Sequence, residues 1–143
     1  NMVLQQQSEV TIWGWANPIE EIRVSSSWDT TVVKTKTDNY ARWMVKIKTP
    51  SAGGPFTVTV AGGDTVTFHN VMIGEVWLCS GQSNMEMSAA WGINNEQQEI
   101  AAANYPNIRL FQVEKRASMN PQIDLKGSWA VCTPVSMKNF SAA

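Results

Sequence analysis

The sequence predicts a chain in two parts: an antiparallel β-sandwich over residues 1–71 and the beginning of an α/β domain over residues 72–143. Three observations predict this fold class. Short segments of alternating hydrophobicity fill the first half, compact apolar strands flank helical segments in the second half, and a small polar turn follows the first of those strands. The length of 143 residues alone would suit one ordinary domain.

The first part alternates apolar and polar residues with the period of a half-buried strand. Over residues 43–48, three apolar residues alternate with Met44 and two lysines, so the apolar row should face a core. Residues 56–60 and 65–69 repeat the pattern around Gly62-Gly63, which is typical of a β-hairpin. Shorter strands are expected over residues 10–15, 21–25 and 31–37. Several short strands with turns at close spacing indicate an antiparallel sandwich.

The second part has largely apolar runs with helical segments between them. Residues 75–79 and 108–113 resemble strands that are buried on both faces. Helical patterns begin at Met85 and, after Asn95 as N-cap, at residues 96–103. A strand, a helix and a strand over about forty residues have the size of a βαβ unit, whose strands are parallel.

The remaining residues continue this domain. Residues 114–127 are expected to form a loop, residues 129–132 a short strand and residues 136–143 a helix that is cut off at its start. Two parallel strands with one crossover cannot cover both faces of their own sheet. The α/β domain is therefore expected to be incomplete within these residues.

Charge and composition exclude several classes of function. The 11 basic and 12 acidic residues give a net charge of -1, which supplies no basic field for a nucleic acid. No apolar run reaches the roughly 18 residues of a membrane span. The single histidine and two cysteines fit no zinc-binding spacing, so we expect no metal and no cofactor. Cys79 and Cys132 could form a disulfide in a secreted protein or remain buried thiols, with Cys79 packed inside its strand.

The polar turn at residues 80–84 holds the residue best placed for chemistry. A serine between a strand and a helix lies at the edge of the sheet where α/β folds bind ligands. The N–H of Ser83 could face a developing oxyanion, and the helix dipole favours negative charge there. From the residues alone, capping of the helix by Ser83 or Asn84 is the commoner role. Gln82 and Asn84 could donate hydrogen bonds to a substrate or to the turn itself.

Other side chains are weaker candidates. Glu86, one turn after Ser83, fits a carboxylate stabilised by the helix dipole better than an acid-base partner. His69 lies on a strand, where a solvated or structural role is the common one. Most tryptophans fall at core positions, whereas Trp28 and Trp91 lie where a ligand could meet them.

The stretch Gly74-Glu75-Val76-Trp77-Leu78-Cys79-Ser80 followed by Gly81-Gln82-Ser83-Asn84-Met85 resembles the nucleophile segment of carbohydrate O-acetylesterases of the SGNH hydrolase superfamily, especially sialate O-acetylesterases. Three outlying stretches resemble the same family. They are residues 1–5 with 13–15, residues 105–111, and residues 129–134 followed by 138–142. The resemblance therefore extends over nearly the whole chain.

The resemblance implies a three-layer α/β/α esterase domain, truncated here, in which Ser83 attacks the acetyl carbonyl and its own amide forms part of the oxyanion hole. It implies an O-acetylated sialic acid or glycan as substrate, no cofactor, and a secreted or periplasmic location. The family takes its other oxyanion donors and its histidine base from later positions, so these residues alone are expected not to hydrolyse an ester.

Two alternatives stay open at this point. The substrate could be acetylated xylan or another polysaccharide, because related acetylesterases share this type of turn. The first half could also be a non-catalytic carbohydrate-binding module, which would leave the polar turn unexplained.

Overall fold

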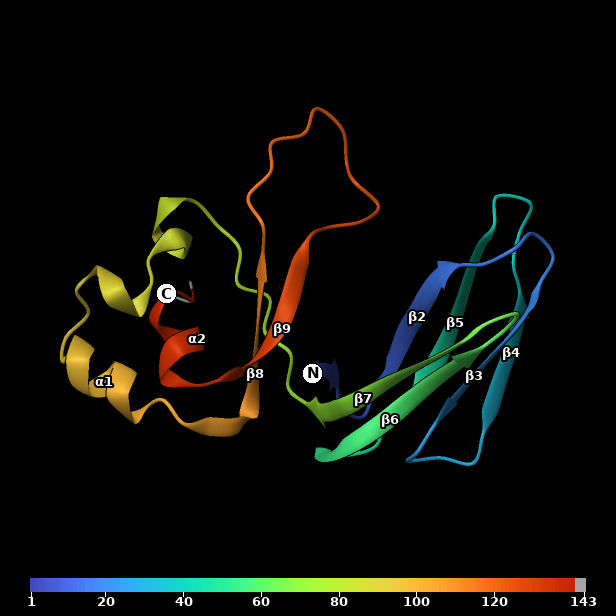
Figure 1. Cartoon of the computed structure of the whole chain (residues 1–143), viewed down its shortest axis with the longest axis horizontal. Coiled ribbons are helices and arrows are strands. Elements are labelled where there is room, and N and C mark those ends of the chain that lie inside the picture. Colours follow the sequence, from blue (N-terminus) through green and yellow to red (C-terminus); the bar gives the residue numbers. More distant parts are fainter. Residues whose placement is uncertain (141–143) are drawn as a thin grey trace. The chain divides into compact units, whose positions relative to one another are not determined.

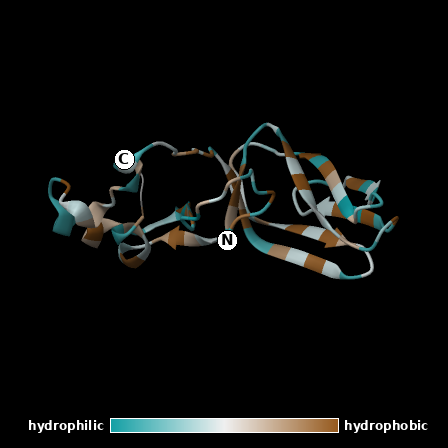
Figure 2. Cartoon of the chain, turned by 90° about the horizontal axis from the view of Figure 1, so that it is seen from above, coloured by the Kyte–Doolittle hydropathy of each residue, from teal (hydrophilic) through white to brown (hydrophobic). Residues whose placement is uncertain are grey.

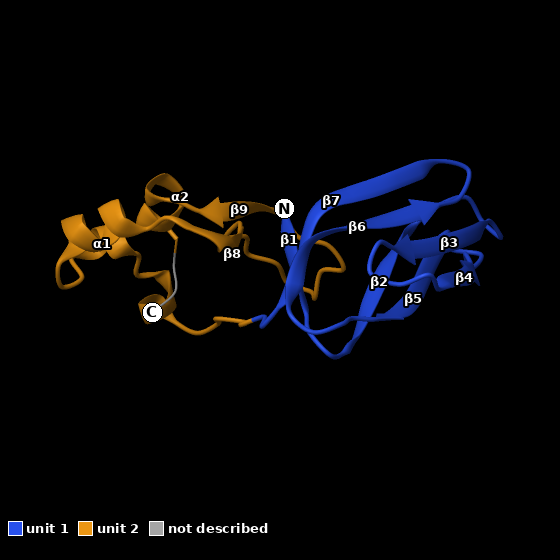
Figure 3. Cartoon of the chain, turned by 90° about the horizontal axis from the view of Figure 1, so that it is seen from below, with its two compact units in different colours: residues 1–76 blue, residues 77–143 orange. Residues whose placement is uncertain are grey.

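The computed structural model describes residues 1–140 and divides the chain into two compact units, Asn1–Val76 and Trp77–Ala143 (Figure 3). Val71, after which the first part was expected to end, lies inside a strand that continues to Gly74. Among the described residues, no helix is long and apolar enough to cross a lipid bilayer.

Unit 1 consists of strands, and unit 2 mixes strands with short helices (Figure 1). The strands of unit 1 are β1 (Met2–Gln5), β2 (Glu9–Trp15), β3 (Glu21–Ser26), β4 (Val32–Lys36), β5 (Arg42–Lys48), β6 (Gly53–Ala61) and β7 (Thr65–Gly74). Unit 2 holds the 3-10 helices η1 (Ser83–Glu86) and η2 (Ala89–Trp91), then α1 (Glu96–Ala102), β8 (Tyr105–Val113), β9 (Gly127–Cys132) and α2 (Pro134–Lys138).

The strands of unit 1 form two sheets. A five-stranded sheet has the order β1-β7-β6-β3-β4, and β2 pairs with β5 in a second sheet of two strands. Every ladder is antiparallel except β1–β7, in which Met2 lies opposite Val71 in a parallel pair. The prediction of a wholly antiparallel sandwich is therefore wrong for this ladder. A parallel pair requires a long connection, and here β2 to β6 supply it.

The core of unit 1 lies between the two sheets. The predicted apolar row of β5 is confirmed, because Trp43, Val45 and Ile47 are buried while the residues between them are exposed. Ile22 and Val24 of β3 pack against this row from the other sheet. Figure 2 shows the alternation of hydrophobic and hydrophilic residues along the strands. This alternation gives each sheet one core face.

One edge of the sandwich is open. Val58 is buried, but its cross-strand partner Phe68 on the same face of the sheet is 41% exposed, and Val66 is 51% exposed. A groove of about 680 Å³ runs beside these side chains and is also lined by Ile12 and Val60. The two-stranded sheet is too narrow to cover the whole inner face of the five-stranded one.

Unit 2 differs from the predicted βαβ unit. β8 pairs with β9 in an antiparallel ladder, where the rings of Phe111 and Trp129 lie 5.0 Å apart. Residues 75–79, expected to form the partner strand, adopt no strand. The ladder between β1 and β7 ends at Gln5 and Gly74, and none of the described strands pairs with the residues that follow. The predicted parallel pair is therefore wrong for these residues.

The helices are shorter than the patterns predicted. In place of a helix from Met85, η1 and η2 are separated by the extended residues Met87 and Ser88. Asn95 does occupy the N-cap of α1, but its side chain makes no capping hydrogen bond.

The last helix begins earlier than predicted. α2 starts at Pro134 instead of Ser136, because Thr133 forms a capping box with Ser136: the Ser136 N–H donates to Thr133 Oγ1 (3.2 Å) and the Thr133 N–H to Ser136 Oγ (2.8 Å). The rest of the predicted helix, residues 141–143, lies outside the described residues. The short strand predicted over residues 129–132 is confirmed within β9.

Candidate active site

The segment that leads to Ser83 is anchored where it leaves unit 1. Gln5 Nε2 donates to Glu75 Oε2 (2.9 Å), and Gln6 Nε2 donates to Glu75 Oε1 (2.7 Å). Gln5 Oε1 accepts a hydrogen bond from the Val76 N–H (3.0 Å), and the Gln6 N–H donates to Gly74 O (2.8 Å). These bonds fix the direction of the chain over Gly74, Glu75 and Val76.

The same contacts set the charge of Glu75. The amide donors of Gln5 and then Gln6 favour the carboxylate form, which lowers the pKa of Glu75 from its usual value. Sequence analysis missed both glutamines as anchors. Their contact with Glu75 lies where the first and last strands of unit 1 end side by side. The residues involved are about 70 positions apart, so a local sequence pattern does not indicate this contact.

An apolar run follows the anchor and is exposed within this chain. Trp77 is 85% exposed and Leu78 is 92% exposed, so the expectation that Trp77 packs in a strand core is wrong here. Cys79 is also exposed, which contradicts its predicted burial, whereas Cys132 is buried. Both thiols are free in the structure. Large apolar side chains side by side at a surface commonly mark a face that another element covers.

Ser83 is the first residue of η1. Its side chain is exposed, and Gln82 precedes it as the N-cap residue. The Met85 N–H donates to Gln82 O (3.0 Å), and this is the first backbone hydrogen bond of the helix. The N–H groups of Ser83 and Asn84 therefore have no partner within the helix, as is usual at a helix start. An exposed hydroxyl and two adjacent backbone donors are among the groups that an acyl-transfer site requires, together with a base.

Gly81 allows the turn before Ser83. A Cβ atom at this position would lie 2.9 Å from Met85 Cγ, closer than such atoms normally approach. The absence of a side chain at Gly81 lets Met85 fold back over the turn. The polar turn therefore has a steric reason for its glycine.

The three predicted site residues are consecutive and exposed. Among the hydrogen bonds of residues 1–140, none involves the side chains of Gln82, Ser83 or Asn84. The alternative in which Ser83 or Asn84 caps the helix is not observed, because Gln82 occupies the N-cap and makes no side-chain capping bond. These three side chains are therefore exposed and make no hydrogen bond within the described residues.

Two further candidates have other surroundings. Glu86, at the end of η1, forms an ion pair with Lys115 and thereby ties η1 to the loop between β8 and β9. Its carboxylate is thus engaged by a cation. His69 lies in β7 of unit 1 and is exposed.

Several tryptophans do not have the surroundings that the sequence predicted. Trp28 is structural: its Nε1–H donates to Lys48 O (3.0 Å), and its ring packs edge-to-face on Phe56 at 5.5 Å. Trp91 is exposed, as a ligand contact would require. Trp13 and Trp15, expected in the core, are each about half exposed.

Among the described residues, neither a metal-ligand cluster nor the pocket in the loop between β8 and β9 involves the predicted site residues. Over residues 1–140, no three His, Cys, Asp or Glu side chains gather where they could hold a metal ion. A depression of about 360 Å³ in the loop between β8 and β9 is lined by residues such as Arg116, Asp124 and Leu125. None of the predicted site residues lines it.

Comparison with known proteins shows what the whole chain is similar to. No family model matches the chain. The sialate O-acetylesterase of Mus musculus is 30% identical over 155 aligned positions, which cover 98% of this chain and 29% of that protein. The sialate O-acetylesterase of Rattus norvegicus is 32% identical over 142 positions, covering 90% of this chain and 26% of that protein. Over nearly its whole length, the chain is similar to members of the sialate O-acetylesterase family.

A solved structure of this kind shares the fold. A carbohydrate acetylesterase from Xanthomonas citri superposes with a TM-score of 0.89 at 36% identity, covering 97% of this chain and 32% of that one. The chain thus spans less than a third of the length of these relatives of the sialate O-acetylesterase family. The predicted family resemblance is confirmed.

Proposed function

We propose that this chain carries the nucleophile of a carbohydrate O-acetylesterase and that Ser83 is this nucleophile. One observation carries the proposal: Ser83 begins η1 with an exposed, uncommitted hydroxyl beside two backbone N–H groups that have no intrahelical partner. Similarity to sialate O-acetylesterases suggests the class of reaction. The geometry supports the nucleophile and the oxyanion donors, two of the parts that the reaction requires.

The proposed reaction is acyl transfer in two steps. Ser83 Oγ attacks the acetyl carbonyl carbon and loses its proton to a base, while the Ser83 N–H donates to the developing oxyanion. The bond between the acetyl carbon and the sugar oxygen then breaks, and the sugar leaves as an alcohol after taking up the proton. Water hydrolyses the acetyl-serine to acetate and restores Ser83.

The base is proposed to come from outside these 143 residues. A serine without a base is a weak nucleophile, and His69 belongs to a strand of unit 1. We therefore infer that the chain alone does not turn over an acetyl ester. Measurable hydrolysis of p-nitrophenyl acetate by the chain, abolished by Ser83→Ala, would contradict this inference.

The finer architecture is also a proposal. We infer a β-sandwich domain over residues 1–71 and the start of a three-layer α/β/α domain of the SGNH type over residues 72–143. The exposure of Trp77 and Leu78 supports it, because the apolar run before Ser83 needs covering layers to become a buried strand. In the whole protein those layers would come from further residues of the same domain.

The proposed substrate is a sialic acid that carries an O-acetyl group. The names of the curated relatives support this choice, and a substrate displayed on glycans suits a secreted or periplasmic enzyme. The relative from Xanthomonas citri is described more broadly, as a carbohydrate acetylesterase. Acetylated xylan or another polysaccharide is therefore the second candidate.

The test compares these substrates in the full-length protein. We expect release of acetate from O-acetylated sialic acid to exceed release from acetylated xylan, and Ser83→Ala to lower it by a factor on the order of 10⁴. Ser80→Ala removes an exposed serine from the same turn and is the matched control. Equal activity of the Ser83→Ala and wild-type proteins would reject the nucleophile, and faster release from xylan would reject the substrate.

A further inference from the structure

The outer face of the two-stranded sheet in unit 1 is exposed. Strand alternation turns Ile12 and Gly14 toward the core, where Gly14 lies against the Trp43 ring, and turns the residues between them outward. The outward residues are, pair by pair across the ladder, Glu9 with Lys48, Thr11 with Lys46, Trp13 with Met44, and Trp15 with Arg42. We call these eight residues the β2–β5 outer face.

Its aromatic half forms a corner. The Trp13 and Trp15 rings lie 5.1 Å apart with an angle of 82° between their planes, so one ring stands on edge beside the face of the other. Trp13 is 46% exposed, Trp15 is 49% exposed and Met44, opposite Trp13, is 62% exposed. Exposed apolar side chains clustered in this way mark interaction sites.

Its other half is cationic. Lys46 lies one outward pair along the ladder from Trp13 and Met44, a step of two residues or about 6.8 Å. Lys46 is exposed, and none of the ion pairs among the described residues involves it. The step is close to the width of one sugar ring, so a ring on the aromatic corner could carry an anionic group that reaches Lys46.

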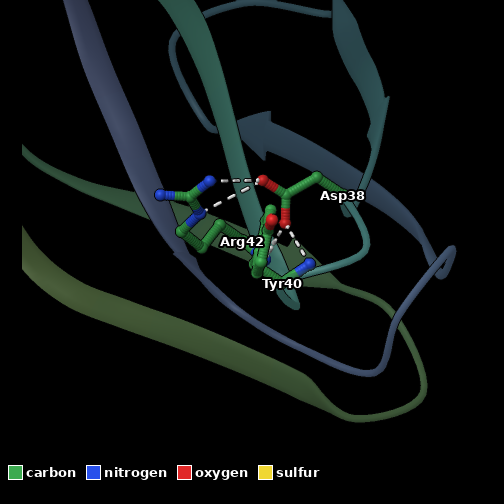
Figure 4. Close-up of polar contacts among 3 residues, drawn as sticks. All are labelled: Asp38, Tyr40 and Arg42. Atoms are coloured by element: carbon green, nitrogen blue, oxygen red, sulfur yellow. Dashed lines mark hydrogen bonds and ion pairs between the residues drawn. The ribbon is translucent and has the colours of Figure 1, made fainter.

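The far end of the face is held rigid. Arg42 donates from Nε to Asp38 Oδ2 (3.1 Å) and forms an ion pair with it, while the N–H groups of Tyr40 and Arg42 donate to Asp38 Oδ1 (Figure 4). The guanidinium also lies 5.1 Å from the centre of the Tyr40 ring. Arg42 is therefore paired with Asp38, and the remaining charges of the face, Lys46, Lys48 and Glu9 opposite Lys48, sum to +1.

We propose that the β2–β5 outer face binds a glycan that carries a carboxylate. The pyranose ring packs its C–H groups into the corner of Trp13 and Trp15, and the carboxylate pairs with Lys46. The choice of an acidic sugar over another anion rests on the proposed function, in which the whole protein acts on acetylated sialic acid. The binding itself requires neither an acetyl group nor Ser83.

The test is a titration of the full 143-residue chain followed by amide NMR spectra. The probe is a sialylated trisaccharide without O-acetyl groups, and lactose is the neutral control. We expect chemical shift changes confined to β2 and β5 and to the indole N–H groups of Trp13 and Trp15, with lactose at least about tenfold weaker. No shift changes, changes elsewhere, or equal affinity for lactose would overturn the proposal.

Two variants test the contacts. Trp15→Ala should weaken binding about tenfold, as expected for loss of an aromatic contact, and Lys46→Gln should weaken it about threefold and reduce its salt dependence. Lys34→Gln removes an exposed lysine of β4, on the other sheet, and should leave the affinity unchanged. Equal effects of Lys46→Gln and Lys34→Gln would reject the site.

The nucleophile proposal for Ser83 and the binding proposal for the β2–β5 outer face can be rejected independently. Ser83→Ala should bind the trisaccharide as the wild type does, since the ligand carries no ester. Absence of binding would reject the β2–β5 outer face and leave the hydrolysis experiment unaffected.

Discussion

Gln5 and Glu75 are 70 positions apart in the sequence, and their side chains meet at 2.9 Å, Nε2 to Oε2. The contact lies where β1 ends beside β7. It ties the first strand of unit 1 to the chain that leaves toward Ser83. The direction of the chain over Gly74, Glu75 and Val76, where unit 1 ends, is therefore set by residues near the start of the sequence.

Stability should fall in acid. Glu20, Glu21, Asp29, Asp38 and Glu75 of unit 1 all have a pKa below the usual value, chiefly because backbone N–H groups or neighbouring side chains donate to the carboxylates. A folded-state pKa below the unfolded one adds stability above the unfolded pKa, and this stability is lost as pH falls through the folded pKa.

We therefore expect the free energy of unfolding from urea titrations to decrease between about pH 5 and about pH 2. Gln5→Ala should raise the pKa of Glu75 toward its usual value and reduce the slope. A free energy of unfolding that increases as the pH is lowered over this range would contradict the assignment.

Gly14→Ala should destabilise unit 1. A Cβ atom at Gly14 would lie 3.0 Å from Trp43 Cζ2 in the core, and overpacking of this kind costs about 1–3 kcal/mol. Gly74→Ala is the control, because a Cβ atom there would meet only Val3 Cγ2 at an ordinary 3.8 Å. Chemical denaturation measures both. Equal stability of the two variants would mean that Gly14 and Trp43 do not pack as described.

Ile22→Ala should lower the free energy of unfolding more than Val32→Ala does. Ile22 is buried in the core between the two sheets, so the lost contacts and the cavity should cost about 2–5 kcal/mol. Val32→Ala, at an exposed position of β4, should change the free energy of unfolding by less than about 0.5 kcal/mol. A comparable loss for both variants would refute the assigned core.

Thr133→Ala should loosen α2. The substitution removes the side-chain oxygen that accepts from the Ser136 N–H, and loss of an N-cap costs about 0.5–2 kcal/mol. Amide hydrogen exchange over residues 135–138 should therefore accelerate, while exchange in β5 stays as it was. Val135→Ala, an exposed position of the same helix, should leave the exchange rates nearly unchanged. Unaltered exchange in Thr133→Ala would show that the capping box does not hold the helix.

The sequence predicted the sandwich strands because their signal is local. Alternation over residues 43–48 reports which side of β5 faces the core, and it needs no knowledge of the partner strand. The parallel partner of β7 was missed, since pairing of Met2 with Val71 leaves no trace in either segment. Trp13 and Trp15 were expected in the core because they share one strand face, but Ile12 and Gly14 hold the inward positions of β2.

The candidate site was only partly predictable for a related reason. The residues Gln82, Ser83 and Asn84 are consecutive, so a sequence motif can identify all three. The strand predicted over residues 75–79 depends on neighbours on both sides, and none of the described strands pairs with it. Its apolar pattern indicates a strand that is buried in the complete domain. In this chain, Trp77 and Leu78 are exposed.

The most direct test of the account maps a covalent adduct. A fluorophosphonate reacts with a serine that a base has activated, and mass spectrometry of the digested full-length protein locates the modified residue. We expect the adduct on Ser83, its loss in Ser83→Ala and its retention in Ser80→Ala. An adduct on a different serine that persists in Ser83→Ala, together with undiminished acetate release, would contradict the assignment of Ser83 as the nucleophile.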